Sequence, residues 1–475
     1  MMGQVIRKEV LANLLSLRFT LALLMAVVLF AVGGFAYVAR YQQQSEDYWK
    51  QTNENLTKFS DNARQLYKLA FHQQRFWRQP TPLTLCAEGY ERYLPNAIRS
   101  SLYYTRPPST SGRGNFLLRR FSDIDWAFIV AVPLSFMALL FTYDSFCGER
   151  EAGTLRLMLA GSVPRYQILI GKYLGALVAF GLPLLVGLCV SLVIVVSSGK
   201  VDIAAGDWWR FLGVFLLSLL YLSVFLLLGM FVSSRVSHSV SSIVVLLLIW
   251  AGIVVLAPSF GSVVAETSVD LPPVSAFRER VLEAMRQADR DAEAGKYGKN
   301  AHEIWHEDPN NPLINPPAAA RYLNTKAADI QRLWEERHGQ VLAQVEAGRR
   351  FACLSPAALY QRAAETLAGT GIGRCAALYR QARDYQETLR HYLIAEDTQD
   401  PNSLHLLFDF DFGVERWGTF SKRPVDFSDV PKFQPRDPAL AESLQLAMWD
   451  IGALGLFNVL LFAGSFVSFL RYDVR

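Results

Sequence analysis

The chain has 475 residues, of which 51% are hydrophobic and only 19% are charged, and its formal net charge at pH 7 is +4. This composition is too apolar and too aromatic for an ordinary soluble domain. The apolar residues gather in runs that approach or exceed the ~20 residues with which a helix crosses a bilayer core of ~30 Å. We therefore predict an all-α polytopic membrane protein with a mainly helical extracytoplasmic domain, in contact with membrane lipid and with no nucleic acid partner.

Six segments are predicted to span the membrane. In chain order they are residues 17–39, 126–143, 173–197, 211–231, 240–260 and 447–470. The first run is longer than the ~7 to 15 apolar residues of a secretory signal, so we expect an uncleaved span there.

Positive charges near the span ends predict the orientation. With a cytoplasmic N-terminus, the inner segments carry Arg7, Lys8, Arg18, Arg150, Arg156, Arg165, Lys172, Arg235, Arg471 and Arg475. The short outer loop 198–210 then carries only Lys200 and Arg210. We expect both termini in the cytoplasm, and residues 40–125 and 261–446 outside it.

Three cysteines, Cys86, Cys353 and Cys375, fall in the predicted outer segments, where disulfides persist. Residues 356–368 are predicted to form a helix of about 20 Å, which separates Cys353 from Cys375 by more than the ~7 Å between Cα atoms that a disulfide allows. We expect Cys86 to pair with Cys353 or with Cys375.

The outer segment also contains the sequence HEIWH, which matches the H-E-x-x-H pattern of zinc peptidases. His302 and His306 would lie on one helix face, beside Glu303. Possible third ligands are His338, His391, Glu335 and Glu336, in no known spacing. Because a proline follows the motif at residue 309 and glycines precede it, we favour an ordinary helix end over a metal site, and expect no bound metal.

The chain lacks the elements that would power transport by itself. No G-x-x-x-x-G-K-[ST] sequence occurs, so we do not expect this chain to hydrolyse ATP. Arg18 and Asp450 lie near span ends, whereas ion-coupled carriers need ionisable residues at depth. The energy for any transport is therefore expected to come from another subunit.

One long inner loop, residues 144–172, carries a dense pattern of charges. It predicts a short helix that begins near Gly148, with Glu149 and Glu151 at its positively polarised N-terminus. Pro164 opens the next helix from a first-turn position. We therefore predict a rigid, charged protrusion at the membrane surface, to which a cytosolic protein can bind.

The loop sequence GEREAGTLRLMLAGSVPRYQILIGK resembles the signature of ABC-2-type transporter permeases, the transmembrane subunits of ABC exporters. Residues 1–16 are similar to the amphipathic connecting helix ahead of their first span. A large insertion between the fifth and sixth spans resembles the subgroup with a periplasmic domain of unknown function. The segment 162–165 departs from the common P-V-x-R turn but keeps its proline and arginine.

The resemblance implies a permease subunit in the bacterial inner membrane, with its large domain in the periplasm. Its expected partners are two ABC ATPase subunits and a second permease chain, identical or paralogous. ATP and Mg would bind to the ATPases, so we expect no cofactor and no catalytic residue in this chain. The residues that the resemblance assigns to the coupling helix and its exit are Glu149, Arg150, Glu151, Gly153, Thr154, Arg156, Pro164, Arg165 and Lys172.

Three functions stay open at this point. The favoured one is export of a substrate from the cytoplasm or the inner membrane. The second is a mechanotransmission permease, which moves its outer domain to act on an envelope partner while nothing crosses the membrane. The least favoured is a membrane-anchored zinc peptidase built on His302, Glu303 and His306.

Overall fold

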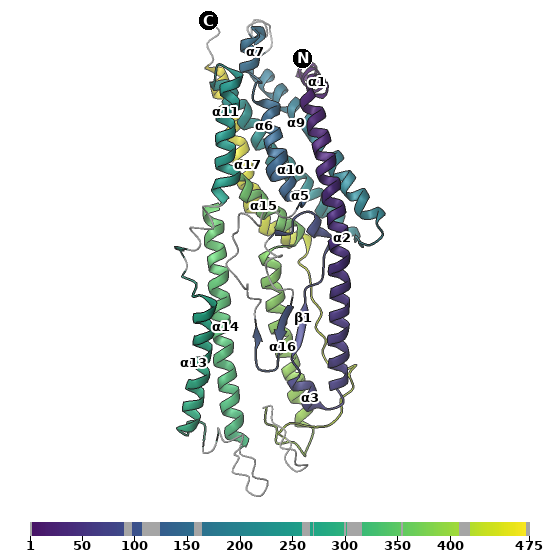
Figure 1. Cartoon of the computed structure of the whole chain (residues 1–475), viewed down its shortest axis with the longest axis vertical. Helices are drawn as coiled ribbons and strands as arrows, with labels where there is room; N and C mark the ends of the chain where they lie inside the picture. Colours follow the sequence, from purple (N-terminus) through teal and green to yellow (C-terminus); the bar gives the residue numbers. More distant parts are fainter. Residues whose placement is uncertain are drawn as a thin grey trace.

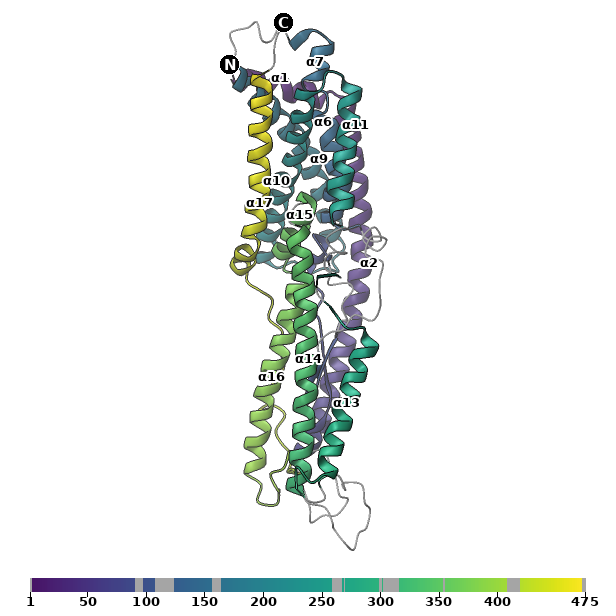
Figure 2. The same cartoon turned by 90° about the vertical axis from the view of Figure 1, so that its left-hand side faces the viewer.

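Long apolar helices form a bundle, and a second group of helices extends from one end of it (Figures 1 and 2). The computed structural model describes residues 2–89, 97–106, 124–155, 164–258, 267–268, 270–298, 301, 316–352, 355–407 and 419–471. Within these ranges, six helices are long and apolar enough to cross a membrane. The prediction of an all-α polytopic membrane protein is confirmed.

The candidate span helices are longer than the apolar runs at their centres. They are Leu17–Asn62 (α2), Trp126–Glu151, Arg165–Ser197 (α9), Ala205–Arg235 (α10), Ser239–Leu256 and Leu440–Leu470 (α17). The second comprises α5 (Trp126–Ile129), the π-helical η3 (Val130–Leu134), α6 (Ser135–Thr142) and α7 (Cys147–Glu151). The fifth comprises α11 (Ser239–Trp250) and the π-helical η4 (Ala251–Leu256). Helix α2 continues far beyond the predicted span because residues 40–62 contain neither proline nor glycine.

A short helix, α1 (Met2–Leu14), precedes the first span and packs along α9. The approach is close because α9 has glycine at the contact: a Cβ at Gly175 would lie 2.6 Å from Cβ of Glu9. Ser16 separates α1 from α2 and caps α2 by accepting a hydrogen bond from the backbone N–H of Phe19 at 3.2 Å.

Small residues let the span helices pack closely around α10. A Cβ at Gly187 of α9 would lie 2.4 Å from the ring of Phe30, and one at Gly229 of α10 would lie 2.1 Å from Thr142. Both positions therefore require glycine, as expected where membrane helices approach one another closely. The Phe30 ring also meets the buried Trp126 edge to face, with ring centroids 6.1 Å apart.

The distal domain consists of the part of α2 beyond residue 40 together with the elements at the lower end of Figures 1 and 2. These elements are α3 (Leu66–Phe71), β1 (Gln74–Trp77), β2 (Ala97–Ser100), β3 (Thr105–Arg106), α13 (Val274–Glu293), α14 (Pro316–Ala352) and α16 (Ile372–Thr398), whereas the short η1 (Pro82–Leu85) packs into the bundle core. The strands form an antiparallel sheet in the order β1-β2-β3, with Phe76 opposite Ile98. These two residues and Tyr385 of α16 belong to one hydrophobic cluster, so the distal domain has a core of its own.

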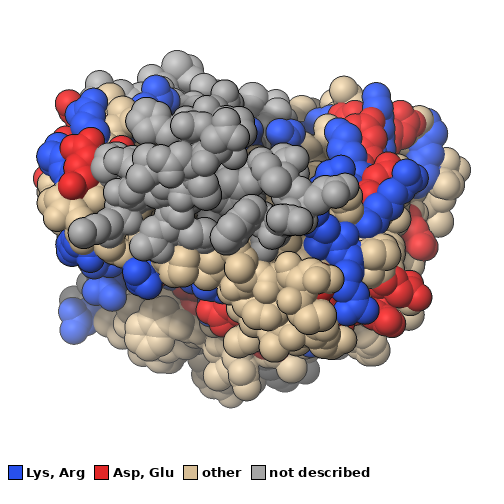
Figure 3. All heavy atoms as spheres, turned by 90° about the horizontal axis from the view of Figure 1, so that it is seen from below, with Lys and Arg blue, Asp and Glu red and all other residues tan. Residues whose placement is uncertain are grey.

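The far end of the distal domain has a surface of mixed charge. In Figure 3, which looks onto this end, basic and acidic side chains lie next to each other on the part that the structure describes. Ion pairs at the C-terminal end of α13 fit this picture, for example Lys296 with Asp291 at 2.6 Å. This face of the described residues carries no large patch of a single charge.

Helix α15 (Pro356–Ala368) lies in the segment 261–446, which is predicted to be extracytoplasmic. It packs against α10 and α17 as part of the bundle core. Tyr360 is fully buried and stacks on Tyr221 of α10 with ring centroids 4.5 Å apart. Arg362 forms an ion pair with Asp450 of α17. A face of alanines permits this close packing, and the ion pair compensates the two charges that the packing removes from water.

The predicted disulfide does not form between Cys86 and Cys375. Cys86 is a fully buried thiol in the core of the bundle, while Cys375 belongs to a different hydrophobic cluster at the base of α16. The Sγ of Cys375 accepts a hydrogen bond from Arg78 at 3.3 Å. Cys353, the alternative partner, lies outside the described residues.

Candidate coupling site

The predicted helix of the charged loop is α7, and its end is closed by a tight turn. The helix begins at Cys147, one residue before the predicted start. Gly153 follows it with φ of 72°, a left-handed conformation that glycine adopts without steric cost. The hydroxyl of Thr154 donates to the carbonyl of Glu149 at 3.3 Å and closes the turn. Residues 150–154 are exposed, whereas Leu155 is buried.

A buried lysine joins α7 to α1 and α9. Nζ of Lys172, on α9, lies 2.6 Å from Oε1 of Glu149 on α7 and 3.4 Å from Oε1 of Glu9 on α1. The Lys172 side chain is only 6% exposed. Among the described residues, the second carboxylate oxygen of Glu149 is buried without a hydrogen-bond partner. Lys172 therefore provides most of the compensation for the Glu149 charge.

The next acidic residue of α7 caps another helix. The carboxylate of Glu151 accepts hydrogen bonds from the backbone N–H of Ser239 at 3.0 Å and from its hydroxyl at 2.6 Å. Ser239 is the first residue of α11, so the negative charge lies where the helix dipole favours it. Arg150 donates to the hydroxyl of Ser237 in the turn between α10 and α11, at 3.4 Å. This turn is therefore tied to α7 by two neighbouring residues.

The N-terminus of α7 is held by a serine of α10. Oγ of Ser233 accepts hydrogen bonds from the backbone N–H groups of Phe146 at 3.0 Å and of Cys147 at 3.2 Å. The first N–H groups of a helix have no partner within it, so Ser233 supplies the missing acceptor.

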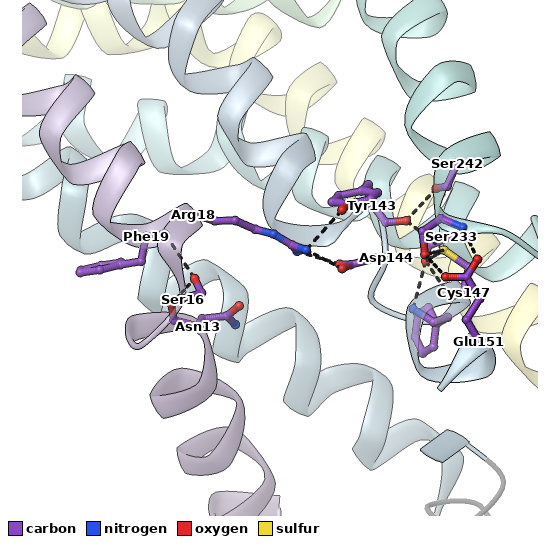
Figure 4. Close-up of polar contacts among 12 residues, drawn as sticks. Asn13, Ser16, Arg18, Phe19, Tyr143, Asp144, Cys147, Glu151, Ser233 and Ser242 are labelled. Atoms are coloured by element: carbon purple, nitrogen blue, oxygen red, sulfur yellow. Dashed lines mark hydrogen bonds and ion pairs between the residues drawn. The ribbon is translucent and has the colours of Figure 1, made fainter. Parts of the chain in front are cut away.

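The first span is tied to the same region by an arginine. Arg18, at the start of α2, binds both carboxylate oxygens of Asp144, at 2.8 and 2.6 Å, and donates to the hydroxyl of Tyr143 at 3.3 Å. Figure 4 shows this side chain reaching from α2 to the residues just before α7, with Ser233 and Glu151 grouped around Cys147 on the other side. Bidentate arginine–carboxylate pairs fix geometry as well as contributing energy.

The remaining predicted residues lie at the exit of the loop or outside the described residues. Pro164 immediately precedes α9. Arg165 donates to the carbonyls of Phe469 and Leu470 at 3.4 and 2.8 Å, where a positive charge complements the end of α17. Arg156 and the candidate metal ligands His302 and His306 lie outside the described residues. Within the ranges described, the structure holds no group of three or more residues suited to a metal ion.

Arg18, Asp144, Ser233 and Ser239 were not among the predicted site residues. Opposite charges near the same predicted end of two spans, at Arg18 and Asp144, were the signal that could have paired them. The two serines gave no comparable signal, because serine is common near the ends of membrane helices and only the fold brings them to α7.

Together these contacts connect one short helix to most of the bundle. Side chains link α7, or the turn just before it, to α1, α2, α9, α10 and α11. Residues 150–154 remain exposed, and two of them, Arg150 and Glu151, present charge at the surface in addition to making these contacts. A force applied to this exposed surface would reach five helices through ion pairs and hydrogen bonds.

Comparison with known proteins agrees with this architecture. A model of the ABC-2 family transporter proteins matches residues 4–474. A probable ABC transporter permease protein NosY of Pseudomonas aeruginosa is 38% identical over 109 residues, which are 22% of this chain and 38% of that relative. A protein of the same description from Stutzerimonas stutzeri is 35% identical over 116 residues, 24% of this chain and 41% of the relative.

These two matches each cover less than half of the relative, whereas the family model covers nearly the whole chain. The resemblance seen in the loop sequence is thereby confirmed at the level of the family. The chain belongs to the ABC-2 family of transporter proteins.

Proposed function

We propose that this chain is the permease subunit of an ABC transporter and that separate ATPase subunits dock on the exposed face of α7. The observation that carries the proposal is the set of contacts through which α7 holds five other helices. The descriptions of the two relatives as probable ABC transporter permeases support it.

Movement of the ATPases would act on the bundle through α7. Closure of two ATPases around ATP and Mg pushes the exposed charges of α7, and Lys172 carries the displacement to α1 and α9. Ser233 and Glu151 carry it to the junction of α10 and α11. Rigid-body motion of packed helices is a common form of such transitions. A second permease chain, identical or paralogous, completes the transmembrane unit.

The α7 end then faces the cytoplasm of a bacterium and the distal domain faces the periplasm. The positive residues near α7 support this orientation. Transport proceeds outward, from the cytoplasm or the inner membrane. The apolar composition of α9, α10 and α11 suits an amphipathic or lipid-like substrate.

Mechanotransmission is the second candidate function. The burial of α15 among the spans favours it, because the helices that flank α15 in the chain, α14 and α16, belong to the distal domain. Movement of the spans would in that case displace the distal domain against an envelope partner, without a substrate crossing the membrane.

Co-purification tests the docking of ATPases. The full-length chain, tagged and extracted in mild detergent, is expected to bring down an ABC ATPase identified by mass spectrometry. Replacing both Glu149 and Glu151 with alanine should abolish the association. Replacing two exposed acids of the distal domain, Glu283 and Glu336, is the matched control and should leave it intact. Absence of any ATPase from the wild-type preparation, or an undiminished yield with the α7 variant, contradicts the proposal.

A further inference from the structure

Two of the span helices contain a π-helical segment, η3 in the second span and η4 in the fifth. In η3 the backbone N–H of Ser135 donates to the carbonyl of Val130, and after η4 the N–H of Ala257 donates to Gly252. Each bond spans five residues, one more than in an α-helix. Such wide turns are uncommon and occur preferentially at functional positions.

The sequence explains why η3 is wide. Pro133 lies inside it, and proline has no N–H and collides with the carbonyl four residues earlier in a regular helix. Widening the turn removes the collision but leaves backbone carbonyls without their usual donors. In a membrane these carbonyls need partners from neighbouring helices.

The structure supplies these partners from side chains. The carbonyl of Ala131 accepts hydrogen bonds from Tyr221 of α10 at 2.9 Å and from Ser135 at 2.6 Å. In η4, the carbonyl of Ile253 accepts from the hydroxyl of Ser355 at 2.7 Å. Ser355 is the N-cap of α15, so the start of α15 is fixed to the π segment of the fifth span.

The two π segments are also bound to each other. The indole N–H of Trp250, the residue before η4, donates to the hydroxyl of Ser135, the residue after η3, at 2.9 Å. The Trp250 ring meets Phe136 edge to face at 5.5 Å between centroids. The second and fifth spans are thus joined where both helices depart from regular α geometry.

Helix α15 is fixed to the bundle at its other end as well. Arg210 of α10 donates to the carbonyl of Leu367 at 2.8 Å, and Arg362 pairs with Asp450 of α17. Tyr360 stacks on Tyr221 and shares a hydrogen bond of 2.8 Å with Ser218. The C-terminal two thirds of α15 are therefore held by α10 and α17, and its N-terminus is held by η4.

Helix α15 thus has its N-terminus attached to the bendable fifth span and the rest of its length attached to α10 and α17, as in a lever. We propose that η3 and η4 are coupled hinges, and that α15 pivots on α10 and α17 so that bending at the hinges moves its N-terminus. That end follows α14 in the chain, whose 37 residues extend over about 55 Å at 1.5 Å per residue. The lever thus converts bending of the spans into displacement of the distal domain. The proposal rests on the proposed function for the source of the motion but not for the mechanical link.

The link predicts reciprocal effects that extend beyond the residues whose hydrogen bond is removed. If the hinges and α15 share one equilibrium, loosening either must loosen the other. If each hydrogen bond acts only locally, its removal will speed amide exchange only in the residues that lose the bond.

Hydrogen–deuterium exchange on the full-length chain in lipid nanodiscs, without nucleotide, separates these cases. Trp250→Phe removes the bond between the hinges, and Ser355→Ala removes the bond between α15 and η4. With Trp250→Phe we expect amides of α15 and of the adjoining end of α14 to exchange about fivefold faster, the effect of one lost hydrogen bond. With Ser355→Ala we expect a similar increase in residues 130–136, although the hydroxyl of Ser355 donates to Ile253 of the other π segment.

Trp209→Phe is the matched control, because Trp209 is 66% exposed and lies on α10. It should change exchange in none of these segments. Effects confined to the residues next to each substitution, or equal effects from Trp209→Phe, overturn the lever.

A second measurement with the bound ATPases separates this proposal from the proposed function. Trapping with ATP and vanadate is expected to change exchange in the hinges and in α14 together, and Trp250→Phe should abolish the change in α14. A change in the hinges of the wild type without one in α14 also overturns the lever. If no ATPase associates, the proposed function fails, and the experiment without nucleotide still decides the link.

Discussion

The two polar regions of the bundle, around α7 and around α15, are built from different interactions. The α7 region depends on ion pairs and charge-assisted bonds of Lys172, Asp144 and Glu151 at a largely accessible end of the bundle. The α15 region depends on stacked tyrosines and neutral hydroxyl bonds in a buried core, with one ion pair. Charged contacts respond to a partner that brings its own charges, while neutral buried contacts hold geometry. We therefore expect the α7 region to receive the force of a bound partner and the α15 region to transmit it through the bundle.

The largest effect is expected at the buried lysine of the α7 region. Lys172→Met removes the cation that binds the partly buried carboxylates of Glu149 and Glu9. Breaking a buried pair from one side costs about 3–5 kcal/mol. We expect the midpoint of thermal unfolding in detergent to fall markedly. Lys200→Met, at an exposed lysine bound to Gln42, is the control and should change it little.

The second-largest effect is expected from titration of Asp125, a buried carboxyl group near α15. Asp125 caps the start of the second span and accepts hydrogen bonds from the N–H groups of Phe128 and Glu88 at 2.7 and 3.0 Å. Burial raises the pKa of Asp125 from 3.8 to about 6, with the nearby carboxylates of Glu88 and Glu365 adding to the increase.

Because the folded-state pKa of Asp125 is the higher one, its contribution to stability is complete below pH about 4 and is lost as the pH rises to about 6. The loss amounts to about 3 kcal/mol. Asp125→Asn keeps a capping side chain without the charge, so the stability difference between wild type and variant should change over this pH range. A difference that is the same at pH 4 and pH 7 would contradict the assignment.

A smaller effect is expected at the serine that holds the start of α7. Ser233→Ala leaves the N–H groups of Phe146 and Cys147 without the acceptor that binds both. An unsatisfied buried donor costs about 1–3 kcal/mol. Thermal unfolding should show a loss within this range, and amides 146–151 should exchange faster. Ser234→Ala, whose hydroxyl bonds only to Phe231 of its own helix, should be nearly neutral.

The sequence predicted those parts of the structure that depend on local patterns. Each apolar run is by itself long enough to require a bilayer, so six spans follow without knowledge of their packing. The start of α7 follows from the charges around Gly148, and α9 begins directly after Pro164. These features involve residues within a few positions of one another.

What the sequence did not predict depends on distant residues. Residues 356–368 mix alanines with Arg362 and Glu365, a composition typical of a soluble helix, and the ion pair of Arg362 with Asp450 joins two residues far apart in the sequence. Arg18 and Asp144 are 126 positions apart. Pro133 within η3 and Pro258, two residues after η4, were local signals of irregular turns, but the bond between the two segments joins Trp250 to Ser135, 115 positions apart.

The smallest effect on stability, and the sharpest test of the comparison, is expected at Arg150. It lies on the exposed face of α7, and exposed substitutions usually change the free energy of unfolding by no more than about 0.5 kcal/mol. If this face receives the ATPases, Arg150→Ala should leave the unfolding midpoint unchanged while reducing the amount of ATPase that co-purifies. The difference between wild type and variant should shrink as salt is added, because salt screens the electrostatic interaction that only the wild type makes. Arg280→Ala, on the surface of α13, should change neither quantity. Equal retention of the ATPase by both variants would mean that the charge of Arg150 belongs to the internal contacts of the bundle, and that the partner binds elsewhere.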